Sequence, residues 1–224
     1  MKKILFAVTM LALQLSVCGQ TKNAQPLKTE TDSLSYCIGL SIGKSLADGD
    51  LQDIEVSKLA QGITDQFKQN PMMTVEQAEM YIQKVLMARQ EAKSLEYKIK
   101  QEEFIATNKK AEGVKTTPSG LQYKVISEGT GPKPTAADVV TVHYTGTLTD
   151  GTVFDSSVQR GEPATFGLSQ VIPGWTEGLQ LMSTGSKYQF FIPQELGYGA
   201  SGMGEIKPYS ALIFEVELIA IGNQ

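Results

Sequence analysis

Aromatic and aliphatic side chains, rather than acids, bases or metal ligands, carry the chemical signal of this sequence. His143 is the only histidine, and the chain contains no CxxC, HExxH or phosphate-loop motif. A histidine-rich metal site is therefore excluded, and no catalytic triad or pair of catalytic carboxylates stands out. We predict a site that works by shape and by exclusion of water, with no cofactor and no metal ion.

Five short segments in the second half of the chain follow one another in a fixed order. They are Tyr144–Gly146, Asp150–Ser157, Val171–Trp175, Leu196–Gly199 and Leu212–Leu218. One such match alone would mean little. The five together resemble the FKBP-type peptidyl-prolyl cis-trans isomerases, and the resemblance runs to the C-terminus.

The resemblance implies a proline-binding pocket. Trp175 would form its floor, and the backbone N–H of Ile172 and the hydroxyl of Tyr198 would bind substrate carbonyls. The residues carried over as catalytic are Tyr144, Phe154, Asp155, Ile172, Trp175, Tyr198 and Phe214, and those carried over as substrate-binding are Arg160, Phe166, Val171 and Ile206. Taken singly, the aromatic residues on strands fit core positions better, so the assignment depends on their joint occurrence.

Three further residues near this pocket have interpretations of their own. Asp155 is interpreted as an anchor, paired with Arg160 or accepting a hydrogen bond from Tyr198, rather than as a catalytic acid. His143 lies in a predicted strand beside a pocket residue, so alternation points its side chain away from the pocket. Met203 stands where many eukaryotic members have histidine, in a loop expected to overhang the pocket, so substrate preference and inhibitor affinity depend on it.

Rotation about an X–Pro bond needs no acid or base. Its barrier of about 18–20 kcal/mol comes from amide resonance. The resonance is lost in the twisted state, whose carbonyl is less polar and needs fewer hydrogen bonds from water. A dry aromatic pocket should therefore bind the twisted amide better than the planar one, which is the differential binding that catalysis requires.

Apolar patterns predict the elements that position this site. The predicted strands are 121–126, 139–146, 189–192 and 211–219, all rich in β-branched and aromatic residues. Residues 174–182 predict the one helix among them. One helix against a mostly antiparallel sheet makes an α+β domain, which we place at residues 113–224.

Helices are predicted upstream of this domain. A second short amphipathic helix follows from the apolar stripe Val56, Leu59, Ile63 and Phe67. Thr74 and Gln77 form a capping box, and no Pro or Gly follows until Gly113, so one long helix is predicted over residues 74–112. Its first half carries an apolar seam, whereas its second half is crowded with charges and is predicted to be a solvated strut. The alternative is a helix folded back along its own domain.

The first predicted helix, with Asp32 or Ser33 as its N-cap, carries a second resemblance. Residues 33–43, with Gly39 and Gly43 four apart on one face, resemble the N-terminal helical domain of the macrophage infectivity potentiator-like isomerases. That resemblance implies a homodimer whose helices occupy residues 32–112. The whole chain is then α+β, with an FKBP-like antiparallel sheet wrapped on one helix after an all-α N-terminal domain.

Residues 1–19 predict a signal peptide, and residues 20–31 predict a flexible tether behind it. The signal is a positively charged start followed by the apolar run Ile4–Leu15, which is too short to span a bilayer. Two processing outcomes fit: lipidation at Cys18, or ordinary cleavage just after it with no lipid. The protein is expected to be exported and periplasmic. Only the lipid would attach it to the outer membrane or cell surface.

The net charge of −4 argues against nucleic acid as a partner. The expected partners are proline-containing unfolded or nascent exported polypeptides, a second copy of the chain and macrolide-type FKBP inhibitors. We predict a folding catalyst that accelerates X-Pro rotation. One alternative is a dimeric holdase-type chaperone for which isomerase activity is incidental. Another, a pocket that binds proline peptides without turnover, is disfavoured because Asp155, Tyr198 and Phe214 are all present.

Overall fold

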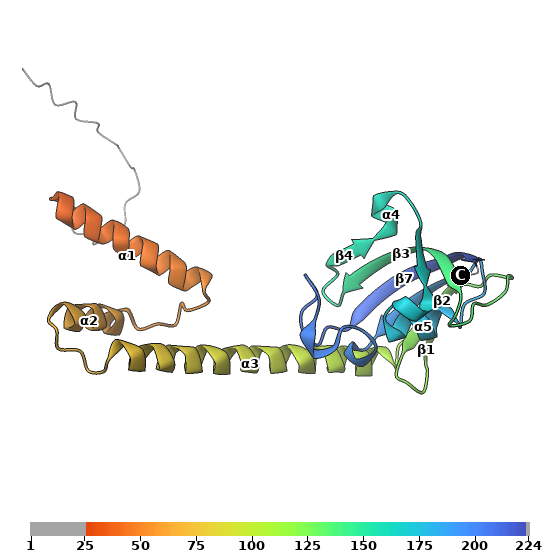
Figure 1. Ribbon diagram of the computed structural model, residues 1–224, viewed down its shortest axis with the longest axis horizontal. Helices are drawn as coiled ribbons and strands as arrows, with labels where there is room; N and C mark the ends of the chain where they lie inside the picture. The colour runs from red at the N-terminus through yellow and green to blue at the C-terminus, as the bar shows by residue number, and fades with distance from the viewer. Residues whose placement is uncertain (1–25, 223–224) are drawn as a thin grey trace, which may run out of the picture. The chain divides into compact units, whose positions relative to one another are not determined.

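The computed structural model of the chain describes residues 26–222. They fall into two compact units (Figure 1): α1 (Glu30–Asp48) and α2 (Val56–Phe67) belong to the first, and α3 (Val75–Asn108) and the whole sheet belong to the second. The predicted signal peptide and Cys18 lie outside the described residues. Between residues 26 and 222, no helix combines the length and the apolar character needed to cross a membrane.

Helix α1 begins earlier than predicted. Its N-cap is Thr29, not Asp32 or Ser33, and a capping box holds the first turn. The Asp32 N–H donates to the Thr29 hydroxyl at 3.0 Å, and the Thr29 N–H donates to the Asp32 carboxylate at 3.0 Å. Because this reciprocal pair satisfies two otherwise unpaired N–H groups, the helix extends into the last residues of the predicted tether.

Helix α3 begins as predicted and ends early. Thr74 is its N-cap, in a capping box with Gln77. The last helical residue is Asn108 instead of residue 112, because the side chain of Gln122 ties the end of the helix to the sheet. Gln122 Nε2 donates to the carbonyl of Ile105 at 2.8 Å, and Asn108 Nδ2 donates to Gln122 Oε1 at 2.8 Å.

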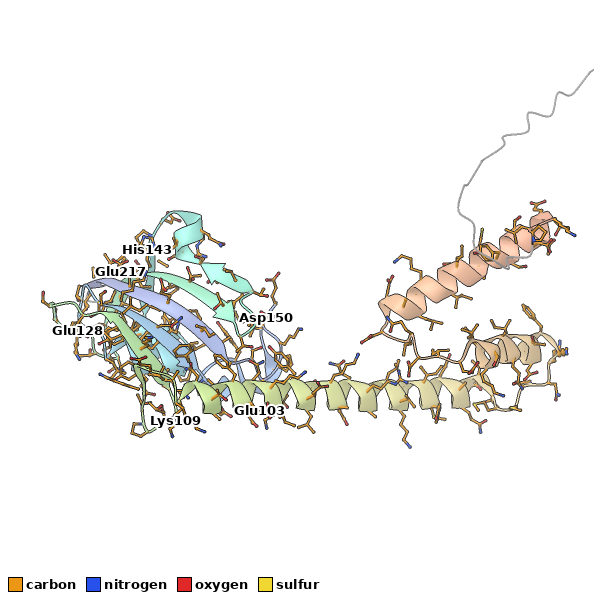
Figure 2. All side chains as sticks on the ribbon, turned by 180° about the vertical axis from the view of Figure 1, so that it is seen from behind. Glu103, Lys109, Glu128, His143, Asp150 and Glu217 are labelled. Atoms are coloured by element: carbon orange, nitrogen blue, oxygen red, sulfur yellow. The ribbon has the colours of Figure 1, made fainter. Side chains whose placement is uncertain are left out.

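The second half of α3 is not a solvated strut. Gln101 is only 6% exposed, and the ring of Phe104 lies 6.3 Å from that of Phe191 in the sheet. The charged residues that motivated the prediction occupy the opposite, exposed face, on which Glu103 is labelled in Figure 2. The second half of the helix therefore packs against the sheet, whereas the first half extends away from it (Figure 1).

A single antiparallel sheet organises the second unit. Its strands are β1 (Val114–Thr116), β2 (Gln122–Ser127), β3 (Val139–Leu148), β4 (Val153–Ser156), β5 (Ala164–Gly167), β6 (Lys187–Ile192) and β7 (Leu212–Gly222). Their order is β1-β2-β6-β7-β3-β4, and β5 also pairs with β3. The α+β class is confirmed. Strands β1, β4 and β5 were not predicted, because they span only three or four residues and are too short to show alternation.

Helix α5 (Pro173–Leu179) packs closely on one face of this sheet. A Cβ at Gly174 would lie 2.6 Å from Cγ2 of Ile192, and a Cβ at Gly178 would lie 2.7 Å from Cε1 of Phe190. The two glycines, one helical turn apart, therefore let the helix approach β6. This contact fixes the position of Trp175, which is 3% exposed.

Candidate active site

A cavity of about 490 Å³ opens between α5 and the neighbouring strands. The residues that line it are Tyr144, Phe154, Asp155, Phe166, Gln170, Val171, Ile172, Trp175, Tyr198, Met203 and Phe214. All the predicted site residues except Arg160 and Ile206 are among them. The structure thus brings the five sequence segments to one place, while the catalytic role of each residue stays a prediction.

Trp175 stands at the centre of the aromatic lining. Its ring contacts those of Tyr144 and Phe214 edge to face, at centroid distances of 5.0 and 5.2 Å, and that of Phe166 at 5.5 Å. Phe154 meets Phe214 in the same geometry at 5.5 Å. Trp175, Tyr144 and Phe214 belong to the buried core, so these rings serve both the core and the pocket.

Gly146 makes room for two of these rings. It lies inside β3, and a Cβ at this position would fall 2.6 Å from Cζ of Phe154 and 2.7 Å from Cε1 of Phe214. Real Cβ atoms do not approach other atoms so closely. The sequence analysis noted this glycine only as part of a motif, although a glycine inside a strand is itself a signal of close approach.

Asp155 is anchored at the pocket edge by two partners. Arg160, at the end of the short helix α4 (Ser157–Arg160), forms an ion pair with it, and the hydroxyl of Tyr144 donates to its other oxygen. Arg160 also donates to the Tyr144 hydroxyl at 3.0 Å. Of the two predicted partners, Arg160 is therefore found. The second partner is Tyr144 rather than Tyr198.

The pKa values in this cluster keep every group in one protonation state near neutral pH. Partial burial alone raises the pKa of Asp155, but hydrogen bonds from Tyr144 and Arg160 and the charge of Arg160 outweigh it and leave the pKa below its usual value. Burial and the hydrogen bond to Asp155 raise the pKa of Tyr144. Burial and the charge of Asp155 likewise raise the pKa of Tyr198.

Three donors at the pocket have no hydrogen-bond partner among the described residues. They are the hydroxyl of Tyr198, the backbone N–H of Ile172 at the start of α5, and the buried indole N–H of Trp175. An open hydroxyl and an open backbone N–H are what carbonyl groups of a bound peptide require. The indole N–H belongs to a ring that meets three other aromatic rings edge to face.

Four further residues lie at or near the margin of the cavity. Ile206 is 5% exposed within the core and does not line the cavity. Instead, its backbone pairs with that of Met203, which overhangs the pocket as predicted and is 60% exposed. Gln170 lines the cavity and was missed, because an exposed polar residue at the end of a single 3-10 turn (Leu168–Gln170) gives no pattern. His143 pairs with Glu217 on β7 and points away from the cavity (Figure 2), but it is half-buried and hydrogen-bonded to Ser157 at 3.1 Å.

Comparison with known proteins covers both halves of the chain. The family described as FKBP-type peptidyl-prolyl cis-trans isomerase matches residues 131–219, and the domain amino terminal to it matches residues 31–125. The outer membrane protein MIP of Legionella longbeachae is 43% identical over 99% of this chain and 98% of its own length. FkpA of Aeromonas hydrophila is 47% identical over 90% of this chain and 81% of its own.

The chain belongs to the FKBP-type peptidyl-prolyl cis-trans isomerases. Both resemblances found in the sequence, to the catalytic domain and to the macrophage infectivity potentiator-like group, are confirmed. The crystal structure of FkpA from Escherichia coli covers 88% of this isomerase and 99% of its own chain, with a TM-score of 0.72 and 34% identity. The enzyme class and the α+β fold of the isomerase are therefore established together.

Proposed function

We propose that the aromatic cavity is the catalytic pocket of this isomerase and that it acts by binding the twisted prolyl amide without covalent or acid–base chemistry. The observation that carries the proposal is the lining itself. Six aromatic rings converge on one cavity, and its single carboxylate, Asp155, is already paired with Arg160 and Tyr144. Among the described residues, no unpaired carboxylate and no imidazole lines the cavity, and the raised pKa of the Tyr198 hydroxyl makes it a poor proton donor near neutral pH.

The cavity has an apolar floor, which would bind the prolyl ring, and a polar edge, which would bind peptide carbonyls. The ring of Trp175, flanked by Tyr144, Phe166 and Phe214, offers the prolyl ring a surface that excludes water. The open donors of Tyr198 and Ile172 are placed to hold peptide carbonyls. The carbonyl of the prolyl amide becomes less polar when the bond twists. In water this change loses favourable hydration of the carbonyl, whereas in a dry cavity there is little hydration to lose. Macrolide-type inhibitors would bind in the same cavity and compete with the peptide.

The substrates we propose are proline-containing polypeptides that fold after export. A protease-free exchange assay on a short X-Pro peptide tests the isomerase, and an aggregation assay on a proline-free client tests the alternative, a dimeric holdase. Acceleration of exchange that is blocked by a competing proline peptide supports the pocket. Suppression of aggregation with no acceleration of exchange would favour the holdase and overturn the proposal.

Assembly into a homodimer through residues 30–95 is the second part of the proposal. No residue between 26 and 72 is buried, and apolar side chains such as Leu34 and Phe67 are 60% and 84% exposed. Gly39 and Gly43 lie four residues apart on one face of α1, and a Cβ at either would meet no atom within 4 Å beyond the adjoining turns of its own helix. A second copy is the partner that would cover these helices, and we accordingly treat residues 32–112 as a dimerisation domain and 113–224 as the isomerase domain.

We expect the mature chain to be a dimer at micromolar concentration, with well over about 1,000 Å² buried, as stable interfaces require. Gly39→Leu should weaken the dimer strongly, because the added side chain would fill the space of the partner helix, and its Cβ is not obstructed within α1 itself. Light scattering measures both. A monomeric wild type, or a Gly39→Leu variant that dimerises as tightly, contradicts this part. Activity of Gly39→Leu on short peptides should be unchanged.

The third part concerns location. The relative from Legionella longbeachae is named an outer membrane protein, and Cys18 follows an apolar run. We propose export to the periplasm and a lipid on Cys18 that holds the protein at the outer membrane. Cys18→Ala should release it from the membrane fraction and abolish lipid labelling. A wild-type protein that is already soluble and begins at Gln20 would show ordinary cleavage instead.

A further inference from the structure

The loop formed by residues 198–211 carries two residues of the pocket. Tyr198 and Met203 line the cavity. Behind them, the N–H of Tyr209 donates to the carbonyl of Gly199 at 2.9 Å and closes the base of the loop. Tyr209 has a φ of 65°, a conformation that residues other than glycine adopt only when surrounding contacts hold it. Because Gly199 follows Tyr198 directly in the chain, a displacement of the Tyr209 backbone would also displace Tyr198 through this hydrogen bond.

Helix α3 holds the base of this loop through hydrogen bonds. The hydroxyls of Tyr97 and Ser210 lie 3.0 Å apart. Gln101 Oε1 accepts the N–H of Ala211 at 3.2 Å and the hydroxyl of Thr149, in the β3–β4 turn, at 3.2 Å. The same oxygen thus joins the helix, the loop and the β3–β4 hairpin.

Two cation–π contacts also join helix α3 to the loop, one from each side. The ammonium group of Lys98 on α3 lies 5.4 Å from the ring centroid of Tyr209, and that of Lys207 in the loop lies 5.6 Å from the ring centroid of Tyr97. Both distances are within the range of cation–π attraction. Each element therefore supplies one cation and one ring to the other.

Burial makes these polar contacts costly to break. Gln101, Ser210 and Ala211 are 6%, 3% and 1% exposed. If the acceptor of Gln101 were lost, the buried N–H of Ala211 would have no partner, which costs more than the bond itself contributes. The loop would then move to regain hydration, and the hydrogen bond to Gly199 would carry that movement to Tyr198.

We propose that Tyr97, Lys98 and Gln101 are positioning residues for the catalytic pocket: helix α3 holds the loop in place so that Tyr198 and Met203 meet the substrate. The inference rests on the proposed function of the pocket. It gives the helical half of the chain a part in substrate binding within each protomer. Because contacts from this loop are present in the bound peptide and in its twisted state alike, their loss raises KM and leaves kcat nearly unchanged.

Gln101→Met tests the proposal, because methionine keeps the length of the side chain and removes the acceptor. Trp175 is the only tryptophan, so its fluorescence in the full-length protein reports binding of an X-Pro peptide directly. We expect the peptide Kd and KM of Gln101→Met to rise about threefold to tenfold. Gln101→Glu keeps an acceptor oxygen and should restore both. Glu103→Gln, on the exposed face of the same helix, is the matched control and should change nothing.

Tyr97→Phe provides a second test if Gln101→Met does not fold, since it removes only the hydroxyl bonded to Ser210 and keeps the ring under Lys207. We expect a smaller rise in Kd and KM in the same direction. Folded variants with wild-type Kd and KM, or a loss in Gln101→Met that Gln101→Glu fails to restore, would overturn the positioning role. A wild type that neither binds the peptide nor accelerates exchange would instead overturn the proposed pocket.

Discussion

Phe214→Ala should lower kcat/KM for isomerisation of a short X-Pro peptide by about 10- to 100-fold. Phe214 is 4% exposed and contacts Trp175, Tyr144 and Phe154, so its loss opens the pocket to water. A loss of about 1.4–2.7 kcal/mol from the transition state alone gives this rate effect. The protease-free exchange assay measures it, below the melting temperature of the variant, because a buried Phe→Ala change also costs stability.

Three further variants test whether the loss of kcat/KM in Phe214→Ala comes from the changed shape of the pocket and the entry of water. Phe214→Leu refills most of the space and should recover much of the activity. Tyr198→Phe removes one hydroxyl, worth roughly 0.5–1.5 kcal/mol, and should lose less than Phe214→Ala. His143→Ala, on the other side of β3, should keep full activity. If Phe214→Ala is folded and fully active, the cavity is not the active site.

Gly146→Ala should reduce kcat/KM by at least about tenfold, although it adds a single methyl group. The new Cβ would overlap the rings of Phe154 and Phe214, at 2.6 and 2.7 Å, and both rings line the cavity. Overpacking of this kind costs about 1–3 kcal/mol, and here the rings can yield only toward the cavity. Exchange kinetics and the peptide Kd from Trp175 fluorescence should both report the loss.

Gly151→Ala separates this effect from general destabilisation. Gly151 lies in the turn between β3 and β4 with a φ of 88°, and a Cβ there would meet no atom within 4 Å. Alanine is strained at such a backbone angle and should lower the melting temperature, while the pocket keeps its shape. Equal losses of activity in the two variants would show that Gly146 acts through stability alone.

The residues that line the cavity could be predicted from the sequence, because the order of the motifs can be read along the chain. The pairing of Asp155 with Arg160 was predicted as well, but its hydrogen bond with Tyr144 was not. That contact depends on the register of β3 and β4, in which Gly146 stands opposite Asp155, and the ring of the preceding inward residue, Tyr144, reaches the carboxylate. No local pattern encodes that register.

For helix α3, contacts with residues distant in the sequence could not be predicted either. Its capping box is local, and its start was predicted correctly. Its charged second half predicts a solvated helix, because the few residues that dock, such as Gln101 and Phe104, are outnumbered by exposed charges. Their partners, Ala211 and Phe191, lie far along the chain. Contacts at that separation leave no periodic signal in the helix.

The dependence of kcat/KM on pH tests the central claim most directly. The lowered pKa of Asp155 means that its carboxylate, and with it the pairing to Arg160, is lost only as the pH falls below the usual range of carboxylates. The raised pKa values of Tyr144 and Tyr198 mean that both hydroxyls ionise only above the usual range of tyrosine. No pocket group therefore changes protonation between pH 6 and 8.

We accordingly expect kcat/KM of the full chain, measured by protease-free exchange at constant ionic strength, to vary by less than about twofold from pH 6 to 8. A bell-shaped or sigmoidal profile with a midpoint in that interval would show that a proton is transferred during turnover, and it would contradict catalysis by preferential binding of the twisted amide.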